Sequence, residues 1–278
     1  MICAKKVMGI VMRRNPSLAA GSAIVATLAI AAALGPILVH ADPLAIDLKE
    51  TLAPPSPAHW LGCDALGRDM LARVLWGGRL SLVVSTVVVT LSLAAGSVVG
   101  GAAALAGGRI DALVMRLIDM VLAFPGFLLA IALAAILGPG LIDLIVALTA
   151  MGWTGYARLV RGEVLSLRER EYVEAARALG ASPGRLLLRH LMPGLAGPVA
   201  VQATFGVGGI IIAEAALSFL GLGALPPAPS WGNMLDSGRA FMIVAPHLTT
   251  APGVAIGASV LGFNLLGDGL ARAIGRRG

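Results

Sequence analysis

The sequence predicts an all-α integral membrane protein with about six transmembrane helices. Of its 278 residues, 58% are hydrophobic and 13% are charged, and the mean hydropathy is +0.89. Soluble domains carry about 25% charged residues, so this composition excludes an ordinary soluble fold. Uncharged runs of about 20 residues, long enough to cross a bilayer as helices, recur along the chain.

Six such runs define the predicted spans. They cover residues 17–39, 80–106, 113–137, 141–160, 195–220 and 248–271. The third run carries Arg116 and Asp119 about one helical turn apart, and we expect these two side chains to pair. The fourth is the weakest, because Asp143 and Arg158 shorten its uncharged stretch. Five or seven spans remain alternatives to six.

The distribution of basic residues predicts the orientation. The chain has 21 Lys and Arg residues. With both termini inside, 16 of the 21 lie on the inner side, and the outer five are Lys49, Arg68, Arg73, Arg79 and Arg239. The positive-inside rule therefore predicts an inner-membrane protein with cytoplasmic N- and C-termini. The net charge of +6 follows from these flanking charges and indicates no nucleic-acid partner.

A cleaved signal peptide is the alternative for the N-terminus. Lys5, Lys6, Arg13 and Arg14 precede the first apolar run, and Val39-His40-Ala41 follows it. The run over 17–39 is longer than the roughly 7–15 residues of a signal core, so we expect a retained helix.

Residues 171–193 predict a charged helical hairpin between apolar segments. Residues 171–179 favour a helix, on which Glu174 and Arg177 are spaced to pair. Gly180 is expected to end that helix in the left-handed conformation. Ser182 as N-cap and Pro183 as first helical residue begin a second helix, carrying Arg185, which we expect to be a short stub ending near Pro193.

The same segment, EAARALGASPGRLLLRHLMP (174–193), resembles the cytoplasmic loop by which permeases of bacterial ABC importers contact their ATPase subunits. The matching positions are Glu174, Ala175, Ala176, Gly180 and Pro193, with His190 and Met192 as small departures. The resemblance implies two ATPase partners that bind ATP and Mg, and no cofactor on this chain. Ser182, Pro183 and Arg185 join these five as candidate coupling residues.

Two outer segments and the C-terminus resemble the second, C-type permease of dipeptide, oligopeptide and nickel importers. They read HWLGCDALGRDMLARVLWGGRLSL (59–82), LSFLGLGALPPAPSWGNML (217–235) and GFNLLGDGL (262–270). The resemblance implies a type I ABC importer (MetI-like) permease architecture. It also implies a homologous B-type permease and an external solute-binding protein, periplasmic or a lipoprotein, as partners.

Spans and resemblance together divide the chain. A cytoplasmic N-terminal segment (1–16) precedes the first transmembrane helix (17–39) and a periplasmic loop with an amphipathic helix (40–79). The permease core (80–272) includes the cytoplasmic coupling hairpin (161–193) and a periplasmic loop (221–247). A cytoplasmic tail (273–278) ends the chain.

The outer loops hold candidate contact or gate residues. These are Asp64, Arg68, Asp69, Pro226, Pro227 and Trp231. Alternating charged and apolar residues over 64–79 predict an amphipathic helix, on the outer surface or leading into the second span. Whether it contacts the binding protein or only seals the interface stays open, and the proline-rich turn before Trp231 fits either a gate or a connector.

Enzymatic activity is not expected. Residues 180–184 match G-x-S-x-G, but a helix precedes them and Pro183 lacks the N–H that an oxyanion hole requires. The chain has no phosphate-binding G-x-x-x-x-G-K-S/T motif and no spacing typical of a metal site. ATP hydrolysis is therefore assigned to the partner subunits.

The resulting hypothesis is a permease subunit that forms a path for di- or oligopeptides and couples it to ATP hydrolysis. Nickel or a nickel chelate is the alternative substrate, and the substrate-binding residues are not predicted. A proton- or sodium-driven carrier is disfavoured, because Glu214 and Asp268 are expected near the ends of their spans rather than at the midplane. A membrane scaffold that recruits a soluble partner is the remaining alternative.

Overall fold

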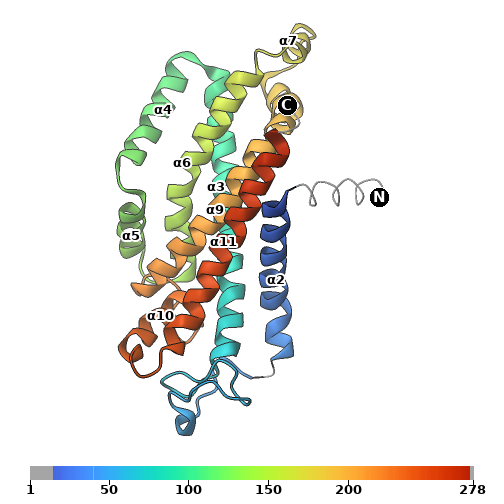
Figure 1. Cartoon of the computed structure of the whole chain (residues 1–278). Coiled ribbons are helices and arrows are strands. Elements are labelled where there is room, and N and C mark those ends of the chain that lie inside the picture. Colours follow the sequence, from blue (N-terminus) through green and yellow to red (C-terminus); the bar gives the residue numbers. More distant parts are fainter. Residues whose placement is uncertain (1–14, 40, 276–278) are drawn as a thin grey trace.

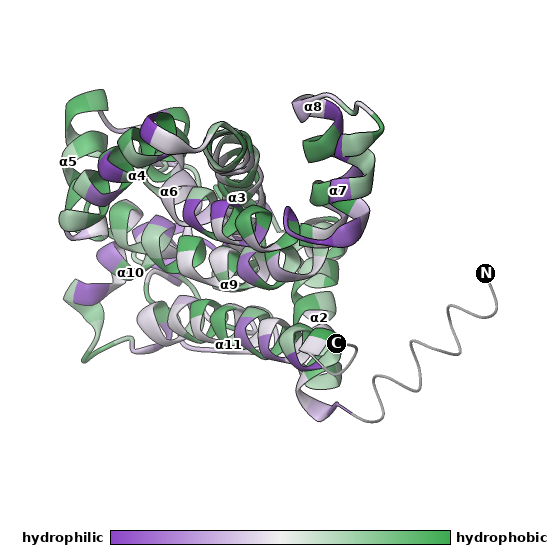
Figure 2. Ribbon diagram, turned by 90° about the horizontal axis from the view of Figure 1, so that it is seen from above, coloured by the Kyte–Doolittle hydropathy of each residue, from purple (hydrophilic) through white to green (hydrophobic). Residues whose placement is uncertain are grey.

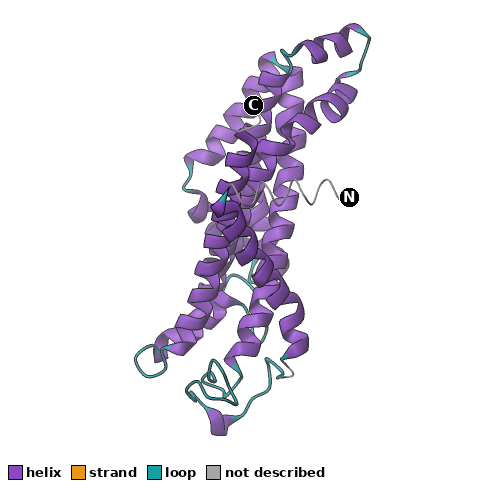
Figure 3. Cartoon of the chain, turned by 45° about the vertical axis from the view of Figure 1, so that its right-hand side comes forward, coloured by secondary structure: helices purple, strands orange, loops and turns teal. Residues whose placement is uncertain are grey.

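A computed structural model describes residues 15–39 and 41–275, and this part of the chain consists of helices and loops (Figure 3). The longer helices are α2 (Pro16–Leu38), α3 (Met70–Ala106), α4 (Gly108–Ala123), α5 (Gly126–Leu137), α6 (Leu141–Leu167), α9 (Met192–Phe219) and α11 (His247–Gly275). The shorter ones are α7 (Glu171–Ala178), α8 (Pro183–Arg185) and α10 (Trp231–Gly238), with the π-helical segment η2 (Leu186–Leu191) and the 3-10 turns η1 (Leu48–Glu50) and η3 (Arg239–Phe241).

The long helices form an elongated bundle around α3 (Figure 1). Helix α3 packs most extensively on α6 and also contacts α9 and α2, while α11 packs between α2 and α9. The hairpin after α6 projects from one end, here called the hairpin end. The loop after α2 and helix α10 lie at the other, here called the loop end. The all-α prediction is confirmed.

Fewer helices meet the length and hydropathy expected of a membrane span than the six predicted. Four helices are long and apolar enough to cross a membrane, or five if α4 and α5 together make one bent span. Helix α6 contains 27 residues, about 40 Å at 1.5 Å per residue, so its length suffices. It falls outside the apolar set because, as predicted for this weakest run, charged residues lie within it.

The third predicted span, 113–137, is not one straight helix. Helices α4 and α5 meet at an angle of 86° at Phe124-Pro125. Phe124 is extended, with φ −81° and ψ 142°, because the ring of the following proline disfavours the α conformation. The predicted span overlooked this proline signal.

The second span begins earlier than predicted, at Met70 rather than residue 80. The Asp69 carboxylate caps α3 by accepting a hydrogen bond from the Ala72 N–H at 2.8 Å. Residues 70–79 are therefore the first turns of α3, while 64–69 belong to the loop. Of the two placements left open for the amphipathic segment, the structure shows the one that leads into the span.

Small residues bring the central helices together, as expected for helices packed in lipid. A Cβ atom at Gly96 or Gly100 of α3 would lie 2.6 Å or 2.1 Å from a backbone oxygen of α6. Likewise, a Cβ at Gly21 of α2 would lie 2.3 Å from the Leu266 nitrogen of α11. Figure 2, which views the bundle from above, shows α3 beside α6 and α2 beside α11.

Candidate functional site

The hairpin at the hairpin end is built on a glycine turn. Gly180 has φ +81°, which confirms the predicted left-handed residue. The Ala181 N–H donates to the Ala176 carbonyl at 3.1 Å and the Gly180 N–H to the Arg177 carbonyl at 2.9 Å. These two bonds form a Schellman motif that satisfies the last carbonyls of α7 and fixes the direction in which the chain leaves it.

The base of the hairpin is anchored in the hydrophobic core. Val173 of α7 and Leu186 of η2 are 0% and 4% exposed. They pack in one cluster with Ala104 of α3, Val160 and Val164 of α6, and Leu191 and Leu195. The hairpin therefore contacts three long helices through apolar side chains.

The second arm of the hairpin is not the predicted stub. From Pro183 the chain continues without a break through α8, η2 and α9 to Phe219, a stretch of 37 residues. Pro193 lies in the first turn of α9, and the π-helical turns of η2 directly precede it. A wider π turn re-pairs the carbonyls that a proline leaves without a donor, so Pro193 does not end the helix. The second arm and the fifth predicted span therefore form one continuous helical stretch.

The tip of the hairpin is exposed and polar, and it also exposes the large apolar side chain of Leu179. Glu174, Ala175, Arg185 and Pro193 are exposed, Ala176 is half-buried, and Leu179 is 89% exposed. Ser182 and Pro183 hold the predicted N-cap and first positions, but the Ser182 hydroxyl makes no capping hydrogen bond. Among the described ion pairs none joins Glu174 to Arg177. Both instead line a cleft of about 440 Å³ with Arg168 and Glu169.

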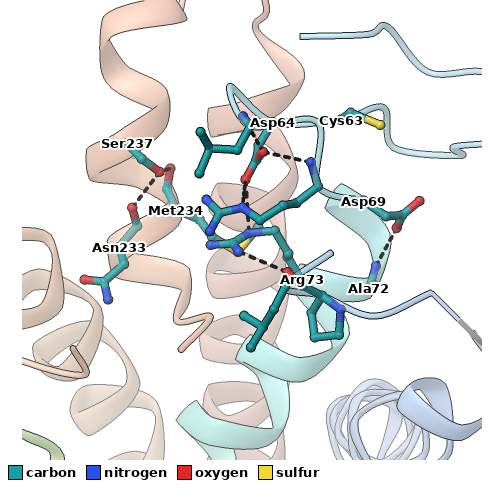
Figure 4. Close-up of polar contacts among 12 residues, drawn as sticks. Cys63, Asp64, Asp69, Ala72, Arg73, Asn233, Met234 and Ser237 are labelled. Carbon is teal, nitrogen blue, oxygen red and sulfur yellow. Dashed lines mark hydrogen bonds and ion pairs between the residues drawn. The ribbon is translucent and has the colours of Figure 1, made fainter. Parts of the chain in front are cut away.

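The loop end contains a buried charge cluster centred on Asp64 (Figure 4). The Asp64 carboxylate is 5% exposed and accepts hydrogen bonds from the Leu66 and Arg68 backbone N–H groups and from the Arg68 guanidinium at 2.7 Å. Arg73 lies 3.5 Å from the same carboxylate and donates to the Pro43 carbonyl at 3.2 Å. Asp69 accepts from His59 at 2.8 Å besides capping α3. These contacts hold the loop on α3.

Burial corrects part of the predicted outer contact set. Trp231 is 2% exposed, and its indole N–H donates to the Val74 carbonyl at 2.9 Å, against Gly77 and Gly78 of α3. Trp231, predicted as an outer contact or gate residue, is therefore an internal packing residue. With Asp64, it cannot offer its side chain to another protein in this conformation. Pro226 and Pro227 are exposed and, with Arg68, line a cavity of about 180 Å³.

Two Asp–Arg pairs between α4 and α6 were not predicted. Arg161 donates two hydrogen bonds to Asp111, at 2.5 Å and 2.6 Å, and Arg158 pairs with Asp119. The predicted pairing of Asp119 with Arg116 on the same helix is therefore wrong. The spacing of Asp111 and Asp119, two turns apart on one helix face, was the available signal.

A buried carboxylate also joins α9 to α3. Glu214 is 0% exposed and accepts hydrogen bonds from Ser81 at 2.7 Å and Ser218 at 2.9 Å. The sequence placed Glu214 near the end of its span but gave no partner. Its hydroxyl partners satisfy a polar group that would otherwise be costly to bury.

Comparison with known proteins decides the family. Residues 92–277 match the family described as binding-protein-dependent transport system inner membrane component. The chain belongs to this family. It is a multi-pass permease subunit of an ABC importer, and its resemblance to the C-type permeases is confirmed by its relatives.

This permease is 41% identical over 263 residues to the glutathione transport system permease GsiD of Pectobacterium atrosepticum, covering 95% of this chain and 87% of the relative. It is equally 41% identical to the dipeptide transport system permease DppC of Alkalihalophilus pseudofirmus, covering 95% and 86%. GsiD of Shigella dysenteriae is 47% identical over 220 residues, covering 79% and 73%.

The fold also has a solved counterpart. One chain of the inward-facing MetNI methionine ABC transporter matches with a TM-score of 0.61 and 20% identity, covering 74% of this permease and 97% of that chain. This similarity confirms the type I importer permease architecture and carries no statement about substrate.

Proposed function

We propose that this permease pairs with a homologous B-type permease and encloses a path for small peptides. The observation that carries the proposal is its 41% identity, across 95% of the chain, to permeases named for glutathione and for dipeptide transport. Both names describe peptides of two or three residues, which favours the peptide substrate over nickel.

The hairpin is the proposed contact for the ATPase subunits. Its tip is exposed, its base lies in the core cluster of α3, α6 and α9, and its second arm continues into a membrane helix. Closure of the two ATPase subunits on ATP and Mg would move the tip, and the anchored base would pass that movement to the bundle. This chain would contribute the lever, and hydrolysis would occur on the partners.

Substrate choice can be tested with the complete importer in vesicles. We expect ATP-dependent uptake of a labelled dipeptide or glutathione delivered by the cognate binding protein, and no competition by nickel. Mass spectrometry of the ligand that co-purifies with the binding protein identifies the substrate independently. Nickel uptake without peptide uptake would establish the alternative, and a membrane scaffold would give no ATP-dependent uptake of either.

Leu179 is expected to contribute to ATPase binding. Burying one leucine is worth about 1.5–3 kcal/mol, so Leu179→Ser should weaken the affinity for the ATPase subunits by roughly tenfold to a hundredfold. Titration of the purified ATPase into permease-containing nanodiscs measures this. Leu179→Met keeps the apolar contact and should bind normally; equal binding by the serine and methionine variants would place the contact elsewhere.

The orientation is proposed from the charge distribution and is tested by labelling. In intact cells, an impermeant thiol reagent should modify Leu48→Cys, which is 69% exposed at the loop end, and leave Ser182→Cys unmodified until the membrane is opened. Cys3 is replaced by serine. Cys63 can stay, because its side chain is buried. Burial, and to a smaller extent the negative charge of Asp69, also raises the pKa of its thiol to about 11, which keeps the thiol in its unreactive protonated form. Labelling of Ser182→Cys in sealed cells would show that the hairpin lies outside and that the proposed orientation is wrong.

A further inference from the structure

The loop end contains an apolar cavity of about 500 Å³ that the transport function does not explain. Its deeper wall is formed by Leu80, Val83 and Val84 of α3 and by Leu141, the first residue of α6. Loop residues 42–44 and 228–229 also line it. The cavity is therefore lined both by apolar residues of α3 within the predicted second span and by loop residues outside it, so we expect it to lie near the level of the lipid headgroups.

The rim of this cavity carries two opposite charges. Arg79 lies with its guanidinium 5.8 Å from the centre of the Trp76 ring, and both line the cavity. Asp42 lies on the same rim, where its carboxylate accepts a hydrogen bond from the Leu44 N–H at 2.9 Å. Within residues 15–39 and 41–275, neither Arg79 nor Asp42 forms an ion pair. Each charge is therefore available to an external group.

We propose that this cavity binds one phospholipid with a zwitterionic headgroup bearing a primary amine. The phosphate would lie against Arg79, the ammonium against Asp42, and an acyl chain along Val83 and Leu141. Arginine beside tryptophan is the side-chain combination that anchors proteins at a membrane interface. The volume lies within the roughly 300–1,000 Å³ of small-molecule sites. The proposal does not depend on which substrate is transported.

The charges, not the apolar wall, would set the selectivity. An acyl chain gains little by leaving the bilayer for an apolar groove, because both surroundings are equally apolar. A headgroup that pairs with both charges gains two charge-assisted contacts. A phosphatidylglycerol lacks the ammonium that Asp42 would pair with. A phosphatidylcholine has a quaternary ammonium, which cannot donate a hydrogen bond to a carboxylate.

Native mass spectrometry of the full permease tests this, with dioleoyl-phosphatidylethanolamine, -phosphatidylcholine and -phosphatidylglycerol added in turn. We expect one tightly retained phosphatidylethanolamine. Arg79→Gln should lower its affinity by roughly tenfold, by loss of a charged hydrogen bond. Asp42→Asn should remove the preference over phosphatidylcholine, about threefold, and should weaken phosphatidylcholine binding less, because a quaternary ammonium makes only a Coulomb contact with the carboxylate.

Arg239 supplies the matched control. It also lies on the outer side over an aromatic ring, 5.6 Å from the centre of Phe219, but it pairs with Asp236 and does not line this cavity. Arg239→Gln should leave lipid retention unchanged. Val83→Trp should fill the groove and displace the lipid. Equal retention of the three lipids, or the same loss with Arg239→Gln as with Arg79→Gln, would overturn the proposal. So would a Val83→Trp variant that keeps its lipid but no longer pairs with the second permease, which would assign the groove to that partner.

Discussion

Replacing Gly180 with valine is expected to abolish ATP-driven uptake while the permease remains in the membrane at near-normal abundance. Gly180 has φ +81°, where a β-branched side chain is strained by about 1–3 kcal/mol. A Cβ at this position would meet nothing within 4 Å, so the backbone is the source of the effect. Relieving the strain breaks the Schellman motif and changes the angle between α7 and the second arm. Uptake and substrate-stimulated ATP hydrolysis in vesicles measure the loss.

Two substitutions separate this effect from a general loss of the hairpin. Gly180→Asn should retain most uptake, because asparagine tolerates the left-handed conformation. Gly184→Ala, in the same hairpin and with nothing within 4 Å of its added Cβ, should transport normally. Wild-type uptake by Gly180→Val would show that the hairpin geometry does not couple hydrolysis to transport.

The hairpin turn was predictable because its signals are local. A glycine after a short helix and a Ser-Pro pair that begins two residues later specify a helix end and a helix start, and the structure has both. The continuation of the second arm through Pro193 was not predictable in this way. It depends on the π-helical turns of η2, which no composition rule encodes, and on burial of Leu191 and Leu195 in the core.

The burial of Asp64 and Trp231 was not predictable, for a different reason. Asp64 and Trp231 read as exposed because charged residues usually are, and because aromatics often mark an interface. Asp64 meets its partner Arg73 only because α3 extends into the loop end. Trp231 packs against Gly77 and Gly78, which come from a distant part of the chain. The pairs of Asp111 with Arg161 and of Asp119 with Arg158 likewise join residues 50 and 39 positions apart, which become neighbours only once the chain has turned back after α5 and α6 lies against α4.

Gly100→Ala is expected to cause a large loss of folded protein, although it adds a single methyl group. That carbon would lie 2.1 Å from the Ala157 carbonyl oxygen and 2.8 Å from its carbonyl carbon, both backbone atoms of α6. Backbone cannot rotate away as a side chain can, so α3 and α6 must separate along the most extensive helix contact of the bundle. Overpacking of this kind costs about 1–3 kcal/mol or more, and the thermal midpoint in detergent should fall by roughly 5–10 °C with reduced membrane abundance.

Neighbouring glycines show whether close approach, rather than glycine itself, is the requirement. At Gly101 the three atoms nearest to the added carbon all belong to the Leu187 side chain, the first at 3.0 Å, and this side chain can shift, so Gly101→Ala should be mild. At Gly155 of α6 nothing lies within 4 Å, and alanine there should be neutral or slightly stabilising, because it favours a helix more than glycine does. If Gly100→Ala melts at the same temperature as Gly155→Ala, α3 and α6 do not approach as closely as the structure shows. The packing account of this bundle would then be wrong at its central pair.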